Sequence, residues 1–341
     1  MVELVSTIPG LCPLPDWGKD ELSDLKGHQK HDLVDGDEGE ELADAYGRVR
    51  EELVSTQADA GLDLIVEGQG RWDDMLAHPL AVHDAVDTRG IVRYYDNNNF
   101  YRDPVVTGDL DFDGDVAAEL EAAAELTDDL AAVLPGPYTL ADLATDEHYG
   151  DETEFLAAIA DFLAGEAEAF PEVESLFLLE PSLVTNPPGD GADERASEAI
   201  DTVASATDAD TVVHTYWDGF DEKVYAHLLD ADVDAVGYDL VNAHDENLYA
   251  VQEYGSKDDV ALGLIDGQNT LVESPGTIRE RVDWFLEGTP VAEFDTIYAT
   301  VNTELFHLPV SVFEAKLDAL ATATADWTPT DPEATEEEVK A

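Results

Sequence analysis

Eight polar side chains stand, in chain order, at the ends of short apolar runs in this sequence. They are Cys12, Glu67, Tyr138, Glu180, His214, Asp239, Asp266 and Thr303. Four carboxylates, one imidazole and one thiol that converge on one site could hold a cation or a zwitterionic substrate. Because 79 of the 341 residues are Asp or Glu, a carboxylate at the end of a run can also reflect composition alone.

These side chains meet only if the runs before them are strands that end at one edge. Eight β-branched or apolar runs cover residues 2–8, 62–67, 131–134, 175–180, 211–214, 235–239, 261–266 and 296–301. Segments with helical spacing follow them at residues 40–60, 76–86, 140–144 with 152–170, 194–204, 221–229, 245–254, 275–286 and 312–323. Eight βα units predict an α/β fold, a single (β/α)8 TIM barrel over residues 1–326 whose chemistry lies at the carboxyl ends of the strands.

Two segments depart from this alternation. Residues 90–113 alternate apolar and polar side chains around Asn97, Asn98 and Asn99, which predicts a β-hairpin inserted on the rim of the barrel. The segment from Trp327 to Ala341 is acidic and rich in Pro and Thr, so we expect a frayed tail.

The charge balance excludes several classes of partner. Sixteen basic against 79 acidic residues leave a formal net charge of −63, which repels nucleic acid and anionic membranes. The hydrophobic share of 44% is that of an ordinary globular protein, so the excess acid indicates a chain adapted to molar salt, where charge repulsion is screened. We therefore expect a halophilic protein.

Redox chemistry and targeting are constrained as well. The single cysteine, Cys12, excludes a disulfide framework and a zinc site built from CxxC pairs. The start MVELVSTIPG lacks the basic and long apolar regions of a signal peptide, and no apolar run reaches the length of a membrane span. We expect a cytoplasmic protein.

Several segments, in order, carry a resemblance to a known family. They are IPGLCPLP at residues 8–15, QADAGLD at 57–63, EGQGRWDDM at 67–75, GPYTL at 136–140, EPSL at 180–183, and the pairs LP at 308–309 and KL at 316–317. From residue 4 to about residue 324 the chain resembles the cobalamin-independent methionine synthase family, in its form with a single catalytic barrel.

The resemblance implies a methyltransferase that moves a methyl group from a methyltetrahydrofolate-like donor, or from a corrinoid, to the sulfur of homocysteine. In that family zinc holds the thiolate and lowers its pKa. Here His214 is kept, Tyr216 stands at one zinc Cys position, and Thr303 falls at the other. Asp239 replaces a Glu ligand. The resemblance thus implies a weakened zinc site of His214, Asp239 and Thr303.

Further roles also follow from the resemblance. Glu67 and Glu180 match the acids that engage the amino group of homocysteine, and Asp266 matches a family position that we assign, with His214, to catalysis. Asp266 can equally be an ion-pair partner inside the barrel mouth. Tyr138 is expected to contact substrate, and Tyr216 either lines or occludes the pocket. Cys12 is expected to be a small packed residue.

Two other functions stay open. The loss of both zinc cysteines fits a catalytically silent chain that acts as partner subunit of a zinc-competent paralogue. A decarboxylase resembling uroporphyrinogen decarboxylase would share the barrel without a metal, but it needs arginines at the mouth, and the chain has only nine arginines. The methyltransferase is the leading hypothesis.

Overall fold

The computed structural model of the chain describes residues 2–25, 39–95, 99–325 and 327–328. Eight parallel strands form one sheet in the order β1-β11-β10-β9-β8-β7-β5-β2. Their bounds are β1 Glu3–Ser6, β2 Ile65–Val66, β5 Leu130–Pro135, β7 Ser175–Leu179, β8 Asp210–His214, β9 Ala235–Asp239, β10 Asp259–Ile265 and β11 Thr296–Val301. Most strand residues are buried, because helices cover one face of the sheet and barrel side chains fill the other. All eight predicted strands are confirmed.

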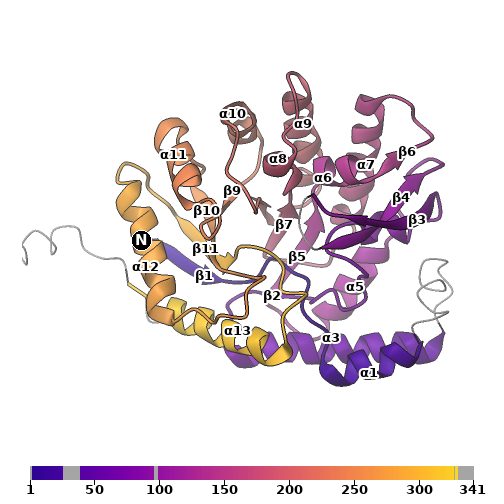
Figure 1. Ribbon diagram of the computed structural model, residues 1–341, viewed down its shortest axis with the longest axis horizontal. Helices are drawn as coiled ribbons and strands as arrows, with labels where there is room; N and C mark the ends of the chain where they lie inside the picture. Colours follow the sequence, from indigo (N-terminus) through magenta and orange to yellow (C-terminus); the bar gives the residue numbers. More distant parts are fainter. Residues whose placement is uncertain (1, 26–38, 96–98, 326, 329–341) are drawn as a thin grey trace, which may run out of the picture.

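The sheet closes on itself where its two edge strands, β1 and β2, meet. The amide of Leu64 donates to the carbonyl oxygen of Ser6 at 3.0 Å, and the amide of Asp63 donates to the same oxygen at 3.2 Å. The Ser6 hydroxyl also donates to the Asp63 carboxylate at 2.6 Å. Helices surround the ring of strands, with α13 and α3 on one side and α9 to α11 on the other (Figure 1). The predicted TIM-barrel-like architecture is confirmed.

Apart from the segment 76–86, the helices match the predicted crossovers closely. They are α1 Asp16–Leu25, α3 Glu40–Ala60, α4 His78–Ala81, α5 Asp115–Ala124, α6 Pro137–Leu143, α7 Glu152–Glu168, α8 Ser182–Thr185, α9 Ala192–Ala204, α10 Glu222–Asp230, α11 His244–Tyr254, α12 Pro275–Gly288 and α13 Val310–Ala325. Local sequence sets several ends. Gly61, at φ 87°, terminates α3 in the left-handed region that glycine favours, and the Asp151 carboxylate caps the first amides of α7.

The inserted hairpin is also present, with shifted bounds. Strand β3 Val86–Arg93 pairs antiparallel with β4 Phe100–Val106, and β6 Thr145–Asp146 adds to β4 in parallel. The hairpin therefore begins and ends earlier than the predicted residues 90–113, because Val86 already pairs with Val106 and the chain enters α5 at Asp115. Of its predicted turn, residues 96–98 lie outside the described part of the chain.

The helix expected over residues 76–86 is wrong in length. Only His78–Ala81 is helical. The carboxylate of Asp74 binds the amides of Leu76 and Ala77, which starts this short turn, and strand β3 takes over at Val86. Buried apolar residues at helical spacing produced the longer expectation, whereas α1, α5 and α8 were not predicted.

Two expectations concern the ends and the membrane. Apart from residues 327–328, the acidic tail falls outside the described part of the chain. In the described ranges, no helix combines the length and apolar character needed to cross a bilayer.

Candidate active site at the carboxyl ends of the strands

A cavity of about 680 Å³ opens at the carboxyl ends of the strands, and we call it the mouth cavity. Its lining residues are Tyr95, Thr185, Trp217, Asp218, Asn242, Asp266, Gln268, Asn269, Thr270, Asn302 and Thr303. Of the residues expected at the site, Asp266 and Thr303 are among them. The other expected residues are not among the lining residues.

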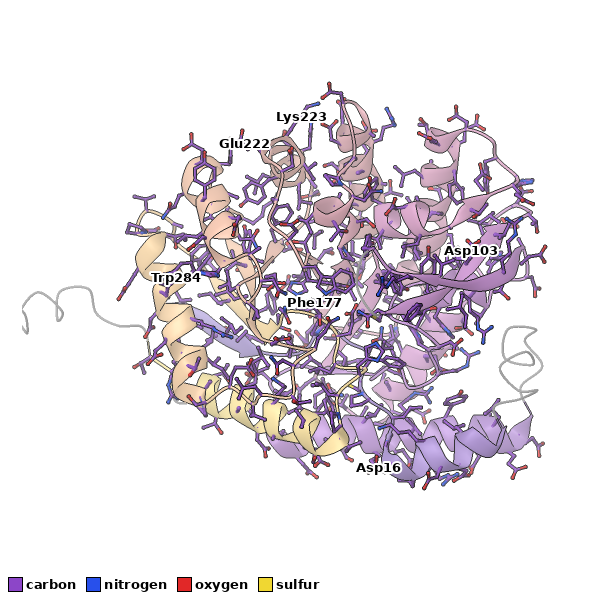
Figure 2. All side chains as sticks on the ribbon, viewed as in Figure 1. Asp16, Asp103, Phe177, Glu222, Lys223 and Trp284 are labelled. Atoms are coloured by element: carbon purple, nitrogen blue, oxygen red, sulfur yellow. The ribbon has the colours of Figure 1, made fainter. Side chains whose placement is uncertain are left out.

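His214 is fully buried at the end of β8 and faces the barrel interior. Its ring lies 6.3 Å from that of Phe177, a fully buried residue near the middle of the view in Figure 2. Nε2 is 3.0 Å from the carbonyl oxygen of Asn302, while Nδ1 is buried and has no hydrogen-bond partner within the described residues. Burial lowers the pKa of His214 to about 4, so the imidazole is neutral at pH 7 and Nε2 carries the proton.

The neighbouring strand leaves room for this ring by means of a glycine. A Cβ atom on Gly237 of β9 would lie 2.2 Å from His214 Nδ1 and 2.9 Å from its Cα. Gly237→Ala is therefore expected to force the two strands apart and to lower the unfolding free energy by about 1 to 3 kcal/mol. Denaturant unfolding in molar KCl measures this. Gly47→Ala on α3, where nothing lies within 4 Å of the added Cβ, is the control and should be neutral or stabilising. Equal stability of G237A and the parent chain would contradict the close approach of Gly237 to His214.

Asp239 is fully buried at the end of β9 and is saturated with hydrogen-bond donors. Oδ1 accepts from the amides of Val241 and Asn242 at 2.8 Å, and Oδ2 accepts from the amide of Trp217 at 2.9 Å. The Asn302 side-chain amide donates to both oxygens at 3.1 to 3.2 Å. Asp239 thus organises the loops around the mouth.

The structure brings His214, Asp239 and Thr303 together through Asn302, which contacts the first two and precedes the third. Thr303 directs its hydroxyl to the Glu304 carbonyl oxygen at 3.1 Å. No group of three His, Cys, Asp or Glu side chains within the described ranges is arranged to hold a metal. Since Asp239 has its oxygens occupied and threonine offers a neutral hydroxyl, these residues do not fit the zinc ion that the resemblance implied.

Glu67 is tied into a buried ion pair. Its Oε1 accepts from Arg50 Nε at 2.9 Å, and Arg50 also binds Glu119. Burial, followed by repulsion from Glu119, raises the pKa of Glu67. Cys12 is buried nearby; burial and the Glu67 charge raise the pKa of its thiol far above the ordinary value. Neither residue lines the mouth cavity.

Glu180 caps the start of α6. It accepts from the amides of Tyr138 and Thr139 at 2.9 and 2.8 Å and from the Thr139 hydroxyl at 2.6 Å. Burial raises the pKa of Glu180 to about 7 against the lowering effect of these bonds. A Cβ atom on residue 136 would lie 2.2 Å from the Glu180 carboxyl group, so only glycine at this position leaves room for the Glu180 side chain. Tyr138 donates its hydroxyl to the Asn186 carbonyl oxygen at 2.8 Å.

Tyr216 and Glu304 form a buried hydrogen-bonded pair. Tyr216 was expected at the site from the sequence, whereas Glu304 was not predicted. The Tyr216 hydroxyl donates to Glu304 Oε1, and the other carboxyl oxygen of Glu304 is buried without a hydrogen-bond partner among the described residues. Glu304 follows Thr303 directly and lies three residues past the end of β11, and this position was the available signal. Burial raises the pKa of Glu304 to about 8.

This pKa makes stability depend on pH. Between the ordinary carboxyl value of 4.5 and about 8, native Glu304 keeps a proton that the unfolded chain has released, so its contribution to stability falls as the pH rises through that window. Glu304→Gln mimics the protonated form. It should reduce the loss of unfolding free energy between pH 6 and pH 8 by up to about 1.4 kcal/mol per pH unit. Denaturant unfolding at several pH values in constant KCl measures the slope, and an unchanged slope would contradict the assignment.

Asp266 remains accessible at the mouth. One of its carboxylate oxygens accepts from the Gln268 amide at 2.9 Å, and its own amide donates to Glu273. Within the described part of the chain it forms no ion pair, so it differs from Glu67, which is paired with Arg50. The alternative that Asp266 is an ion-pair partner finds no contact there.

Two aromatic residues of the cavity were missed. Tyr95, from the hairpin, and Trp217, from the loop after β8, have φ values of +41° and +81°, which bulky side chains rarely adopt. Their ring centroids lie 5.4 Å apart. The contact between these two rings could not be predicted from the sequence, because it depends on how the inserted hairpin folds over the barrel.

Comparison with known proteins identifies the family. A family model described as the N-terminal domain of cobalamin-independent synthase matches residues 83–278, more than half of the chain. The sequence segments resemble the single-barrel, catalytic form of that family, whereas the matching family model describes the family's N-terminal domain.

Curated relatives and a solved structure agree with that match. A 5-methyltetrahydropteroyltriglutamate–homocysteine methyltransferase of Salinibacter ruber is 26% identical over 337 residues, covering 84% of this chain and 42% of that protein. A methionine synthase of Saccharolobus solfataricus is 21% identical over 295 residues and 84% of each chain. The chain thus spans less than half of the first relative and most of the second.

The structure of a B12-independent methionine synthase from Shewanella sp. W3-18-1, in complex with selenomethionine, has the same fold. It superposes with a TM-score of 0.77 at 20% identity, over 98% of both chains. With the family model matching more than half of its residues, the chain belongs to the cobalamin-independent methionine synthase family.

Proposed function

We propose that the chain takes part in methionine-synthase-type methyl transfer, in which a methyl group passes from a methyltetrahydrofolate-like donor to the sulfur of homocysteine. The family membership and the names of both relatives support this reaction class. The observation that carries the proposal is the mouth cavity, which lies at the carboxyl ends of the strands, where barrels of this kind bind their substrates. Its volume suits a small-molecule ligand.

A second candidate, a partner subunit of a zinc-competent paralogue, is favoured by the chemistry of the same cavity. A methyl acceptor must react as a thiolate, and a thiolate needs a nearby positive charge or metal to lower its pKa. Asp218 and Asp266 line the cavity, no Lys, Arg or His of the described ranges is among its lining residues, and the donor set does not fit zinc. In this arrangement the chain would bind substrate or donor while the paralogue activates the thiol.

Metal content and turnover separate the two candidates. The chain is purified with zinc present, its metal is counted, and methyl transfer to homocysteine is assayed with the chain alone and with the paralogue. Methyltetrahydrofolate and a methyl-corrinoid are tested as donors in parallel. Turnover by the chain alone supports direct catalysis, and turnover only with the paralogue supports the partner role. No effect of the chain on turnover in either arrangement would refute both.

A pair of variants connects turnover to the mouth cavity. Asp266→Asn removes a cavity carboxylate and should reduce turnover, or the stimulation of the paralogue, by about tenfold. Asp128→Asn removes an exposed carboxylate just before β5, at the opposite end of the barrel, and should leave turnover unchanged. Equal activity of both variants would place the reaction elsewhere.

A further inference from the structure

We propose that the mouth cavity recognises a compact organic cation, an ammonium or sulfonium group, which packs against the wall formed by the rings of Tyr95 and Trp217 and pairs with the carboxylates of Asp218 and Asp266. This inference rests on the proposed function in taking the mouth cavity as the ligand site, and it adds the charge class of the ligand. These four residues come from three separate parts of the chain: the hairpin and the loops after β8 and β10.

The lining residues of the mouth cavity indicate that the ligand carries a positive charge. Two carboxylates contribute, and the remaining polar lining consists of amides and hydroxyls: Thr185, Asn242, Gln268, Asn269, Thr270, Asn302 and Thr303. No basic side chain is among the lining residues, which belong to the described ranges. A ligand with a positively charged group therefore meets attraction from Asp218 and Asp266, whereas an anionic group finds amide and hydroxyl donors but no countercharge.

The two cavity carboxylates also keep free acceptor capacity on the cavity side, unlike the buried acids at the strand ends. Glu67, Glu180 and Asp239 are buried and already bound to Arg50, to the start of α6 and to the loop amides. Asp218 accepts from the Gly219 amide at 2.9 Å, and Asp266 accepts from the Gln268 amide at 2.9 Å. Neither forms an ion pair in the described part of the chain, so each can serve as counterion for a ligand.

The aromatic wall is held in place by buried polar groups. Asp239 accepts the Trp217 amide at 2.9 Å and so fixes its unusual backbone conformation. The Trp217 ring packs edge-on against Tyr216 at 4.7 Å, and Tyr95 is anchored by a hydrogen bond between its hydroxyl and Ser182. Backbone strain of this kind persists only where the surroundings enforce it, and it concentrates at binding sites.

The aromatic faces distinguish an organic cation from a hydrated metal ion. The face of a Trp or Tyr ring is electronegative and attracts ammonium groups, most strongly when these are stripped of water. Alkylated cations lose their hydration at lower cost than K⁺ or Na⁺ because their charge is spread over methyl groups. The pair of rings therefore favours an alkylated cation even in the presence of molar KCl.

A matched pair of probes tests the charge directly. Choline and its uncharged isostere 3,3-dimethylbutan-1-ol are titrated into the full chain by calorimetry at constant ionic strength in KCl. We expect choline to bind at least about tenfold more tightly than the alcohol. Equal affinities, or no choline binding, would overturn the proposal.

Variants locate the binding. Asp266→Asn and Tyr95→Leu should each weaken choline binding by about tenfold, whereas Asp128→Asn, at the opposite end of the barrel, should not. Circular dichroism confirms that each variant is folded. Choline affinity that D266N and Y95L leave unchanged would overturn the assignment to this cavity. Because the titration needs no turnover, choline binding with no effect of the chain on methyl transfer, alone or with the paralogue, would refute the proposed function and leave this inference standing.

Discussion

At low ionic strength the chain is expected to unfold, and molar KCl is expected to restore the native structure. The formal net charge of −63 over 341 residues makes the folded state strongly self-repelling. The Debye length falls from about 10 Å at 0.1 M salt to about 3 Å at 1 M, which screens neighbouring surface charges from one another. The expected change in unfolding free energy is about 5 kcal/mol or more, the size of the whole stability of many proteins.

The helices show where this repulsion arises. Ten of the twelve described helices have no basic residue in their last turn, where Lys or Arg would normally complement the helix dipole. The few exposed bases are shared among several acids. Lys223, at the start of α10 on the outer rim (Figure 2), binds both Asp190 and Asp193. Added cations must provide the countercharge that the sequence lacks.

Thermal unfolding followed by circular dichroism from 0.1 to 3 M KCl measures this dependence. Sucrose at low salt is the control, because it stabilises folded proteins by exclusion from the surface without screening charge. Screening predicts a large gain in KCl and a small gain in sucrose. Equal stability at 0.1 and 2 M KCl would contradict the halophilic interpretation.

Lys316→Met is expected to cost about 3 to 5 kcal/mol of unfolding free energy, because it leaves a largely buried carboxylate unpaired. Lys316 lies on α13 with none of its side chain exposed, and its Nζ is 2.7 Å from Glu273 Oε2 and 2.6 Å from the Leu271 carbonyl oxygen. Glu273 in turn accepts the amide of Asp266 at 2.9 Å. This one lysine therefore anchors the loop that carries one wall of the mouth cavity.

A double variant separates charge from packing. Lys316→Met combined with Glu273→Leu removes both charges and should recover much of the stability lost by K316M, because the isolated buried charge is gone. Denaturant unfolding in 2 M KCl compares the parent, the single variant and the double variant. Unfolding of K316M at the parent's midpoint would contradict a stabilising role for the pair. A buried pair is weakly screened, so the loss should persist at high salt.

The sequence by itself determined the barrel. Eight apolar runs separated by helical periodicity leave few ways to bury the apolar surface, and each run became a strand of the sheet. Helix α3 was predicted to its exact bounds because Gly61 ends it locally, by backbone conformation. The hairpin was visible in the alternation of its residues, and only its bounds, which depend on pairing between the two strands, were displaced.

Only the tertiary structure decided which polar strand ends can meet a ligand. Glu67, Glu180, His214 and Asp239 all stand at strand ends, yet each is buried against partners far along the chain, Arg50 and Asn302 among them. The spacing of residues in the sequence determines at which edge of the sheet a side chain lies. It does not determine which other residue forms a hydrogen bond or ion pair with that side chain. That choice depends on side-chain packing over long separations, as does the meeting of Tyr95 with Trp217 over the mouth cavity.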